Sequence, residues 1–237
     1  MTQARLDVLA IGDAVVDVIA RADDSFLEEE GLVKGSMQVL DADGATRLYA
    51  RMRQARETSG GSAANTMAGL AALGGKAGFV GQVADDQLGE IFTHDIRALG
   101  VEFVTPPRAD GLPTRRCLIL VTPDAQRTMN TFRGAAHELS ADALDTDQIQ
   151  DAAILYLEAY LWRSAGPREA MREALRIAHA AGRKVALTLS DIACIAPHRD
   201  DFLALIDGGG LDLLFANEAE IKSLAEAPSR EAAIEAL

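Results

Sequence analysis

The chain has 237 residues, 49% of them hydrophobic and 25% charged, which is typical of a folded protein with one large α/β domain or two small ones. The net charge of −13 argues against a general surface for nucleic acid or anionic membrane, and no apolar run is long enough to cross a bilayer. Two distant cysteines and four scattered histidines predict a protein of the reducing cytoplasm without disulfides or zinc, with every histidine on the surface or on a helix face (Cys117, Cys194, His94, His137, His179, His198).

The first predicted strand covers residues 6–11, an apolar run that ends at Gly12-Asp13 as a buried parallel strand ends at a turn. Residues 15–19 continue in β-forming side chains, whereas a dinucleotide-binding domain would enter a helix after its glycine loop. Asp17 therefore lies in an extended segment, either facing solvent or accepting hydrogen bonds in a cleft. Composition alone favours the solvent-facing position.

The next elements are an acidic helix over residues 23–30, a short strand over 36–40, and a helix from an Asp41 N-cap to about residue 56. A second core strand is predicted over residues 76–80. It is followed by a glycine-containing turn and a helix over 86–99.

Between these helices, residues 58–74 join a glycine turn to an alanine-rich helix. Gly60 and Gly61 can adopt positive φ and let a ligand approach the backbone. Ser62 is a plausible N-cap, and the amides of the first helical turn would face that ligand. A phosphate or a polyol suits this place, but a tightly packed turn explains the same residues, and this run alone slightly favours the packed turn.

From residue 101 to 132 the pattern changes to short β-rich segments separated by proline, glycine and aspartate turns. We expect a small antiparallel sheet inserted into the α/β chain. Residues 15–40 and 101–133 would together form a discontinuous lid.

After Gly134 the chain alternates again between strands and helices. The predicted strands are 153–157, 184–189 and 211–216, and the predicted helices are 167–181, 197–206 and 217–225. This alternation indicates a parallel sheet with helices on both faces.

Polar side chains follow directly after many of the predicted strands, where ligands bind in open α/β sheets. They suggest hydroxyl binding and a metal held through water. Each could instead be a helix cap, which alone explains Ser190, Asp191 and Asn217 well, and only their joint occurrence favours a site. The set is Asp13, Asp85, Asp86, Glu158, Ser190, Asp191, Asn217 and Glu220.

Along essentially its whole length the sequence resembles the ribokinase and adenosine kinase family, the PfkB-type carbohydrate kinases. Three segments carry the resemblance: residues 60–65 with the glycine- and aspartate-containing run 74–89, residues 12–17, and the Asn-x-x-Glu motif of residues 217–220. It implies a ribokinase-like three-layer α/β/α fold with a mostly parallel central sheet and a small β-sheet lid. Residues 1–237 would form one incomplete kinase core.

The resemblance also implies a reaction: ATP-dependent transfer of a phosphoryl group to the hydroxymethyl group of a sugar or nucleoside, with Mg²⁺. The glycine run then becomes a wall of the sugar site, and the lid excludes water and offers a surface for a homodimer. Glu220 would act on Mg²⁺ through water. The implied substrate-binding residues are Asp13, Asp17, Gly60, Gly61, Asn65 and Glu158, and the implied nucleotide-binding residues are Asn217 and Glu220.

Residues 188–191 and 213–220 look closer to adenosine kinase-like members, which favours the 5′-hydroxyl of a nucleoside or ribosyl group as acceptor. Fructose or a keto-deoxy sugar acid is the alternative. The family's Gly-Ala-Gly-Asp turn, which supplies the catalytic aspartate, does not occur in the sequence. We therefore expect no catalytic base in this chain and expect that base beyond Leu237. A truncated inactive binding module, or an unrelated α/β protein with structural glycines, remain the other readings.

Overall fold

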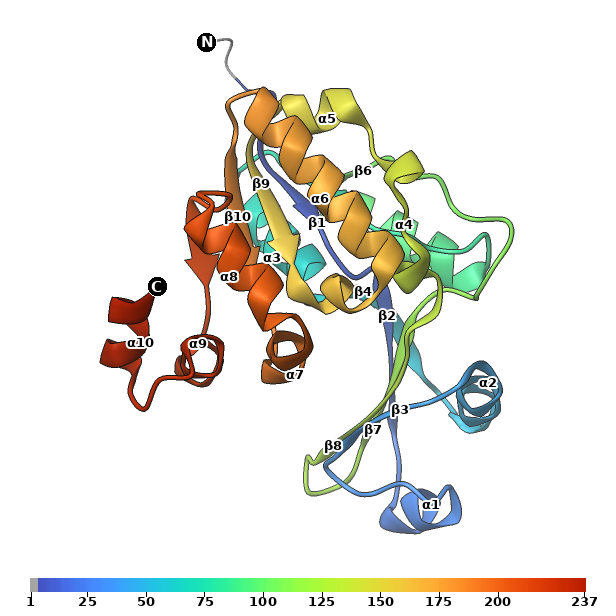
Figure 1. The fold of residues 1–237 in the computed structure, drawn as a ribbon. Helices are drawn as coiled ribbons and strands as arrows, with labels where there is room; N and C mark the ends of the chain where they lie inside the picture. The colour runs from blue at the N-terminus through green and yellow to red at the C-terminus, as the bar shows by residue number, and fades with distance from the viewer. Residues whose placement is uncertain (1–3) are drawn as a thin grey trace.

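The computed structural model describes residues 4–237 and contains two sheets (Figure 1). The larger sheet has six strands in the order β11-β10-β9-β1-β5-β6, and every neighbouring pair is parallel. Its strands are β1 (Leu6–Ile11), β5 (Ala77–Val80), β6 (Glu102–Phe103), β9 (Ala152–Glu158), β10 (Lys184–Thr188) and β11 (Leu213–Phe215).

Helices cover both faces of this sheet. On one face, α3 (Ser62–Ala72) and α4 (Gln87–Ala98) enclose a core that includes the mutually contacting rings of Phe79, Phe92 and Phe103. The other core is built around α6 (Ala165–Ala180). The predicted three-layer α/β/α fold is confirmed. The remaining helices of this part are α5 (Thr146–Gln150), α7 (Ile192–Ile195), α8 (Arg199–Asp207), α9 (Glu218–Ala225) and α10 (Arg230–Ala236), with 3₁₀ turns η1 (Gly134–Glu138), η2 (Ala141–Ala143), η3 (Ala159–Arg163) and η4 (Ala196–His198).

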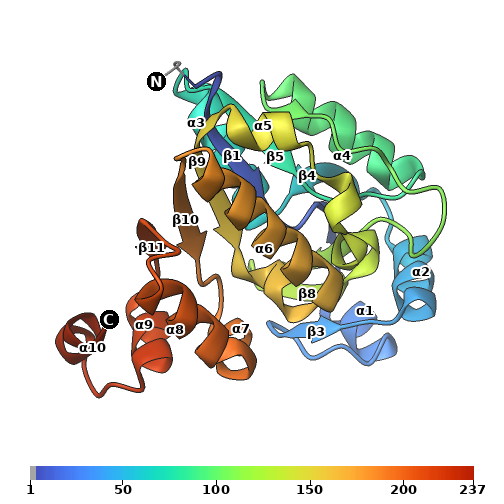
Figure 2. The same ribbon diagram turned by 45° about the horizontal axis from the view of Figure 1, so that its top comes forward.

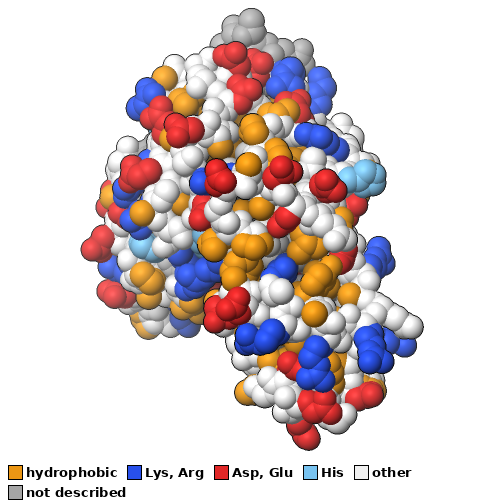
Figure 3. Space-filling view, turned by 90° about the vertical axis from the view of Figure 1, so that its right-hand side faces the viewer, with side chains coloured by type: hydrophobic (Ala, Val, Ile, Leu, Met, Phe, Trp, Pro, Cys, Tyr) orange, Lys and Arg blue, Asp and Glu red, His pale blue; other side chains and the backbone are white. Residues whose placement is uncertain are grey.

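The smaller sheet projects from the body as a lid, and in side view hydrophobic side chains gather where the two lobes meet (Figure 3). Its strand order is β3-β8-β7-β2-β4. Leu27 and Leu48, from two lid helices, pack with Val18 and Leu118 on one face of this sheet. The elements are β2 (Val15–Arg21), α1 (Asp24–Glu29), β3 (Met37–Val39), α2 (Ala42–Arg51), β4 (Arg56–Gly60), β7 (Arg116–Val121) and β8 (Arg127–Phe132).

Four local predictions differ from the structure. The smaller sheet, predicted to be antiparallel, is mixed, because β2 pairs parallel with β7 and β3 parallel with β8. The segment at residue 101, assigned to the lid, supplies β6, which pairs with β5 in the central sheet because Phe103 is buried against Phe79. The helix predicted to residue 56 ends at Arg51, and β4 follows it, paired with β2. Gly61, and not Ser62, occupies the N-cap position of α3.

The lid and the body meet where β1 continues into β2 through Gly12, Asp13 and Ala14. All three residues are buried, and the Gly12 N–H donates to the carbonyl of Val80. Helices α9 and α10 lie beside the β11 edge, away from the lid strands (Figure 2). Among residues 4–237, no helix is long and apolar enough to span a membrane.

Candidate acceptor site

Glu158 ties two turns together at the carboxyl end of the central sheet. Its side chain is fully buried; Oε2 accepts from the Asp13 N–H at 2.7 Å and Oε1 from the Ala63 N–H at 3.2 Å. Burial, reinforced by the nearby charge of Asp13, raises the pKa of Glu158 to about 7. The structure therefore gives Glu158 a supporting role between β1 and α3, and its direct contact with a sugar stays a prediction.

Glycines allow these turns to touch. Gly61 has a φ of 102°, and a Cβ there would overlap with the backbone oxygen of Asp13. A Cβ at Gly12 would lie 2.5 Å from Cβ of Ala63 and 2.8 Å from Oε2 of Glu158. The close-packed turn is therefore real, and the same packing places the start of α3 beside Asp13.

Asp17 lies on β2 at the base of the lid, opposite Cys117 of β7 and Thr58 of β4. Burial raises its pKa, and the charge of Arg115 acts in the opposite direction. The carboxylate rests against the backbone of Gly60, where an added Cβ would overlap with it. Asp17 is thus held in a half-buried position instead of facing open solvent.

Gly60→Ala should disturb the site more than the fold. Gly60 does not have positive φ, so the backbone accepts alanine, but the new methyl group displaces the Asp17 carboxylate. We expect acceptor affinity to fall about tenfold, a cost of about 1.4 kcal/mol, with a change in unfolding free energy below about 1 kcal/mol. Calorimetry and urea unfolding measure the two effects. Gly69→Ala is the control, because a Cβ there meets nothing within 4 Å and should leave affinity unchanged; equal losses in both variants would contradict the prediction.

Two basic side chains that sequence reasoning did not assign to the site lie beside Asp13. The Nε of Arg115 is 3.1 Å from Oδ1 of Asp13, and Nε2 of His137 is 3.7 Å from Oδ2. His137 lies in the 3₁₀ helix η1, as the predicted helix-face position allows, but its side chain is only 9% exposed and points to Asp13 instead of solvent. The sequence feature that could have indicated Arg115 is the pair Arg115-Arg116 at the start of a strand. Successive strand residues point to opposite faces of the sheet, so the two arginines cannot both point outward.

The other predicted residues lie in separate parts of the same sheet edge. Asn65 is exposed on α3, one turn after Gly61. Asn217 and Glu220 form a capping box at the start of α9, with Oδ1 of Asn217 2.9 Å from the Glu220 N–H and Oε2 of Glu220 3.0 Å from the Asn217 N–H. They follow β11, three strand spacings or about 14 Å from β1. The geometry thus separates the implied nucleotide residues from the implied sugar residues.

Other polar residues after the strands act as helix caps. Asp86 accepts from the Gly89 N–H at 2.8 Å and Asp191 from the Ala193 N–H at 2.7 Å. Ser190 has a φ of 65°, a strained conformation for a serine at the end of β10. The capping explanation therefore holds for Asp86 and Asp191.

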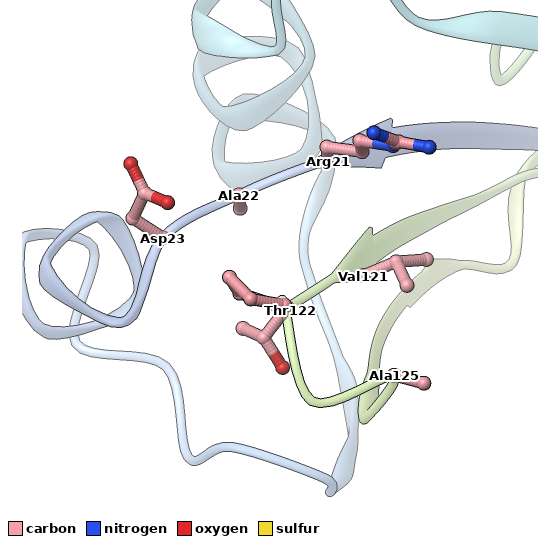
Figure 4. Close-up of a pocket in the computed structure, with 7 residues that line it drawn as sticks. Arg21, Ala22, Asp23, Val121, Thr122 and Ala125 are labelled. Atoms are coloured by element: carbon pink, nitrogen blue, oxygen red, sulfur yellow. The ribbon is translucent and has the colours of Figure 1, made fainter.

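A different hollow lies at the tip of the lid (Figure 4), lined by Arg21, Ala22, Asp23, Val121, Thr122, Pro123 and Ala125, with a volume of about 670 Å³. It is at the opposite end of β2 from Asp13, about 20 Å along the strand. In the close-up, Arg21 and Asp23 point away from each other. This hollow is therefore distinct from the candidate acceptor site.

A parallel α/β/α core joined to a second small sheet beside two carboxylates, Asp13 and Asp17, defines the class: an α/β protein of the kind that binds ligands beyond the carboxyl ends of its strands. Residues 5–237 match the pfkB family carbohydrate kinases, and the chain belongs to this family.

The related proteins are kinases of nucleosides and sugars. The crystal structure of adenosine kinase from Sinorhizobium meliloti superimposes with a TM-score of 0.86 at 52% identity, covering 98% of this chain and 71% of that one. Guanosine-inosine kinase of Escherichia coli K12 is 30% identical over 184 residues, 70% of this chain and 40% of that protein. The 5-dehydro-2-deoxygluconokinase of Shouchella clausii is 29% identical over 188 residues, 78% of this chain and 51% of that protein. The chain thus spans about half or less of the length of these two curated relatives.

Proposed function

We propose that this chain forms the acceptor-binding part and the lid of an ATP-dependent kinase that phosphorylates the 5′-hydroxyl of a nucleoside. The observation that carries the proposal is the juxtaposition of Asp17 with an apolar lid face. A carboxylate accepts hydrogen bonds from paired ribose hydroxyls, and an adjacent apolar surface suits a nucleobase. The similarity to adenosine kinase and to guanosine-inosine kinase supports the same acceptor class.

The pairing register of the lid strands defines the apolar lid face beside Asp17. Asp17 and Cys117 are paired, and the next row on the same face contains Ile19, Ile119 and Met129, because alternate residues of a strand share a face. Helices α1 and α2 pack on the opposite face, through Leu27 and Leu48. The row of isoleucines and methionine is left only partly buried.

Ile119→Asn should weaken nucleoside binding specifically. The change replaces apolar contact area beside Asp17 with an amide, and we expect a loss of about 1–2 kcal/mol, or about 5–30-fold in adenosine affinity. Ribose alone, which lacks the base, should bind the variant and the parent equally. Val121→Asn is the matched control, since it lies on the same strand and face one row farther from Asp17. Equal loss of adenosine and ribose binding, or equal loss in the control, would contradict the nucleobase assignment.

A fructose or keto-deoxy sugar acid acceptor is the second candidate, favoured by the similarity to 5-dehydro-2-deoxygluconokinase and by the cationic Arg115 beside Asp13. Isothermal calorimetry with adenosine, ribose, fructose and 2-keto-3-deoxygluconate distinguishes these acceptors. Adenosine binding at least tenfold tighter than the others is the expected result. Preferred binding of the sugar acid would replace the nucleoside proposal, and binding of none of these four ligands would contradict the proposed acceptor class.

ATP and Mg²⁺ are the proposed phosphate donor and cofactor. Among residues 4–237, no three or more histidine, cysteine or carboxylate side chains gather to hold a metal directly. Both oxygens of Glu220 already accept hydrogen bonds, from the backbone and the side-chain amide of Asn217. These residues therefore fit Mg²⁺ held through water, where the ion would neutralise phosphate charge.

The lid edges are the proposed homodimer surface, and the cytoplasm is the proposed location. On the edge strand β3, Met37 and Val39 are 60% and 57% exposed, and an unpaired edge can extend a sheet across two copies. Both cysteines are free thiols, which fits a reducing compartment.

A further inference from the structure

Arg115 occupies the joint between the lid and the body. Its carbonyl accepts from the Val16 N–H at 3.0 Å, which fixes it to β2. Gly134 packs so closely on the other side that an added Cβ would lie 2.8 Å from the Arg115 nitrogen. The backbone at Arg115 is therefore held between β2 and η1, and its side chain starts from a fixed point.

The side chain of Arg115 extends from the lid toward the body. It is 15% exposed, and its Nε lies 3.1 Å from Oδ1 of Asp13, whose side chain is 4% exposed; the contact is an ion pair without hydrogen-bond geometry. Its Nη1 is 3.3 Å from Nε2 of His137, and Nδ1 of His137 is 2.7 Å from Oγ of Ser164 at the start of α6. Because arginine only donates hydrogen bonds, Nε2 of His137 accepts and its Nδ1 carries the proton. In this arrangement Arg115 is the cation paired with Asp13.

The same side chain lies on the sheet face of the lid carboxylate. Asp17 pairs with Cys117, and Arg115, two residues before Cys117 and bonded to Val16, shares the face of that pair. The guanidinium charge opposes the rise that burial causes in the pKa of Asp17. Other charged groups around this joint are Glu158 of β9, which the charge of Asp13 influences, and Arg133 and Arg163, which repel each other. One cation thus pairs with a carboxylate of the body and shares a sheet face with a carboxylate of the lid.

We propose that Arg115 is a positioning residue whose cation pairs with Asp13 and lies beside Asp17, so that both carboxylates accept hydrogen bonds from the acceptor hydroxyls. The acceptor part rests on the proposed function. The electrostatic part does not, because it concerns the two carboxylates of the free protein.

Three variants separate charge, geometry and general packing. Arg115→Met removes the charge, and Arg115→Lys keeps the charge but loses the fork that reaches Asp13 and His137 together. Arg116→Met is the matched control: Arg116 is the next residue, packs on Tyr49 and Phe132, and donates to Oγ1 of Thr46. A structural loss in the lid should appear in that control as well.

The first readout is the titration of the Asp17 carboxyl carbon by ¹³C NMR in the free protein. We expect its midpoint to rise by about 0.5 pH unit or more in Arg115→Met and to stay at the parent value in Arg115→Lys and Arg116→Met. An unchanged midpoint in Arg115→Met, or an equal rise in Arg116→Met, would overturn the proposal. If Arg115→Met does not fold, Arg115→Gln supplies the same comparison.

The second readout is adenosine binding by calorimetry between pH 5.5 and 8. Arg115→Met should bind about tenfold more weakly, with the largest loss at low pH, and Arg115→Lys should bind about threefold more weakly without the added pH dependence. Parent-like binding in both variants would refute the positioning role. If the parent protein binds no nucleoside or sugar, the proposed function fails, while the NMR midpoint still decides the role of Arg115.

Discussion

Asp17→Asn should lower acceptor affinity about 100-fold or more while the protein stays folded. A carboxylate accepts hydrogen bonds from two hydroxyls at once, and each charge-assisted bond contributes about 1.5–3 kcal/mol. Asparagine offers one acceptor oxygen, and its amide group would face a hydroxyl or the backbone of Gly60. Because burial already disfavours the ionised Asp17, the neutral side chain should not destabilise the fold.

Calorimetry with the parent and variant at pH 8 measures the affinity loss. The parent should also bind more weakly as the pH falls through the raised pKa of Asp17, since protonation removes an acceptor, and the variant should lack this part of the pH dependence. Asp43→Asn, an exposed aspartate in the first turn of α2, is the control and should bind like the parent. A variant with parent-like affinity would remove Asp17 from the acceptor site.

The parallel core was predictable because most of its strands are buried apolar runs that alternate with helices. The lid was harder. Strand β4, Arg-Glu-Thr-Ser-Gly, has no apolar alternation and becomes a strand only through its pairing with β2. Strand β6 is two residues long, and burial of Phe103 in the aromatic cluster of the body decides its sheet. Pairing partners and shared cores, which are long-range properties, determine both assignments.

The candidate site also contains residues that the sequence predicts and residues that it does not. Asp13 lies at the end of β1, so its place beside the start of α3 follows from the parallel topology. Asp17 and Gly60 become neighbours through the antiparallel pairing of β2 with β4. Arg115 and His137 reach Asp13 from segments about 100 residues or more later in the chain, and only the folding of the lid onto the body brings them there. The apolar face beside Asp17 depends on the register of β2, β7 and β8, which a one-residue slip would invert.

Glu158→Gln should abolish a pH dependence of stability that the parent shows between pH 4.5 and about 7. The pKa of Glu158 is raised from 4.5 to about 7 in the folded protein, chiefly by burial and then by Asp13. Between these values the native state retains a proton that the unfolded chain has lost, so the free energy of unfolding decreases as the pH rises. The pKa difference between the folded and the unfolded chain corresponds to about 3 kcal/mol in the free energy of unfolding. Above pH 7 both states are ionised, and the full cost of the buried charge is present.

Urea unfolding of parent and variant at pH 5, 6, 7 and 8 tests this expectation. Glutamine is neutral at every pH, so the free energy of unfolding of the variant should rise by about 3 kcal/mol relative to that of the parent across the series. A constant cost of about 1–2 kcal/mol applies at every pH, because the amide group of glutamine faces a backbone N–H. Glu28→Gln, at an exposed position of α1, should show the same pH dependence of the free energy of unfolding as the parent. Glu158→Ala should be about 3–5 kcal/mol less stable than the parent at pH 5, because the N–H groups of Asp13 and Ala63 are left buried without an acceptor. This deficit should shrink as the pH rises, since alanine does not titrate. Parallel curves for the parent and Glu158→Gln would show that Glu158 is ionised in the folded protein down to its ordinary pKa, and that the joint between β1 and α3 tolerates its charge without cost.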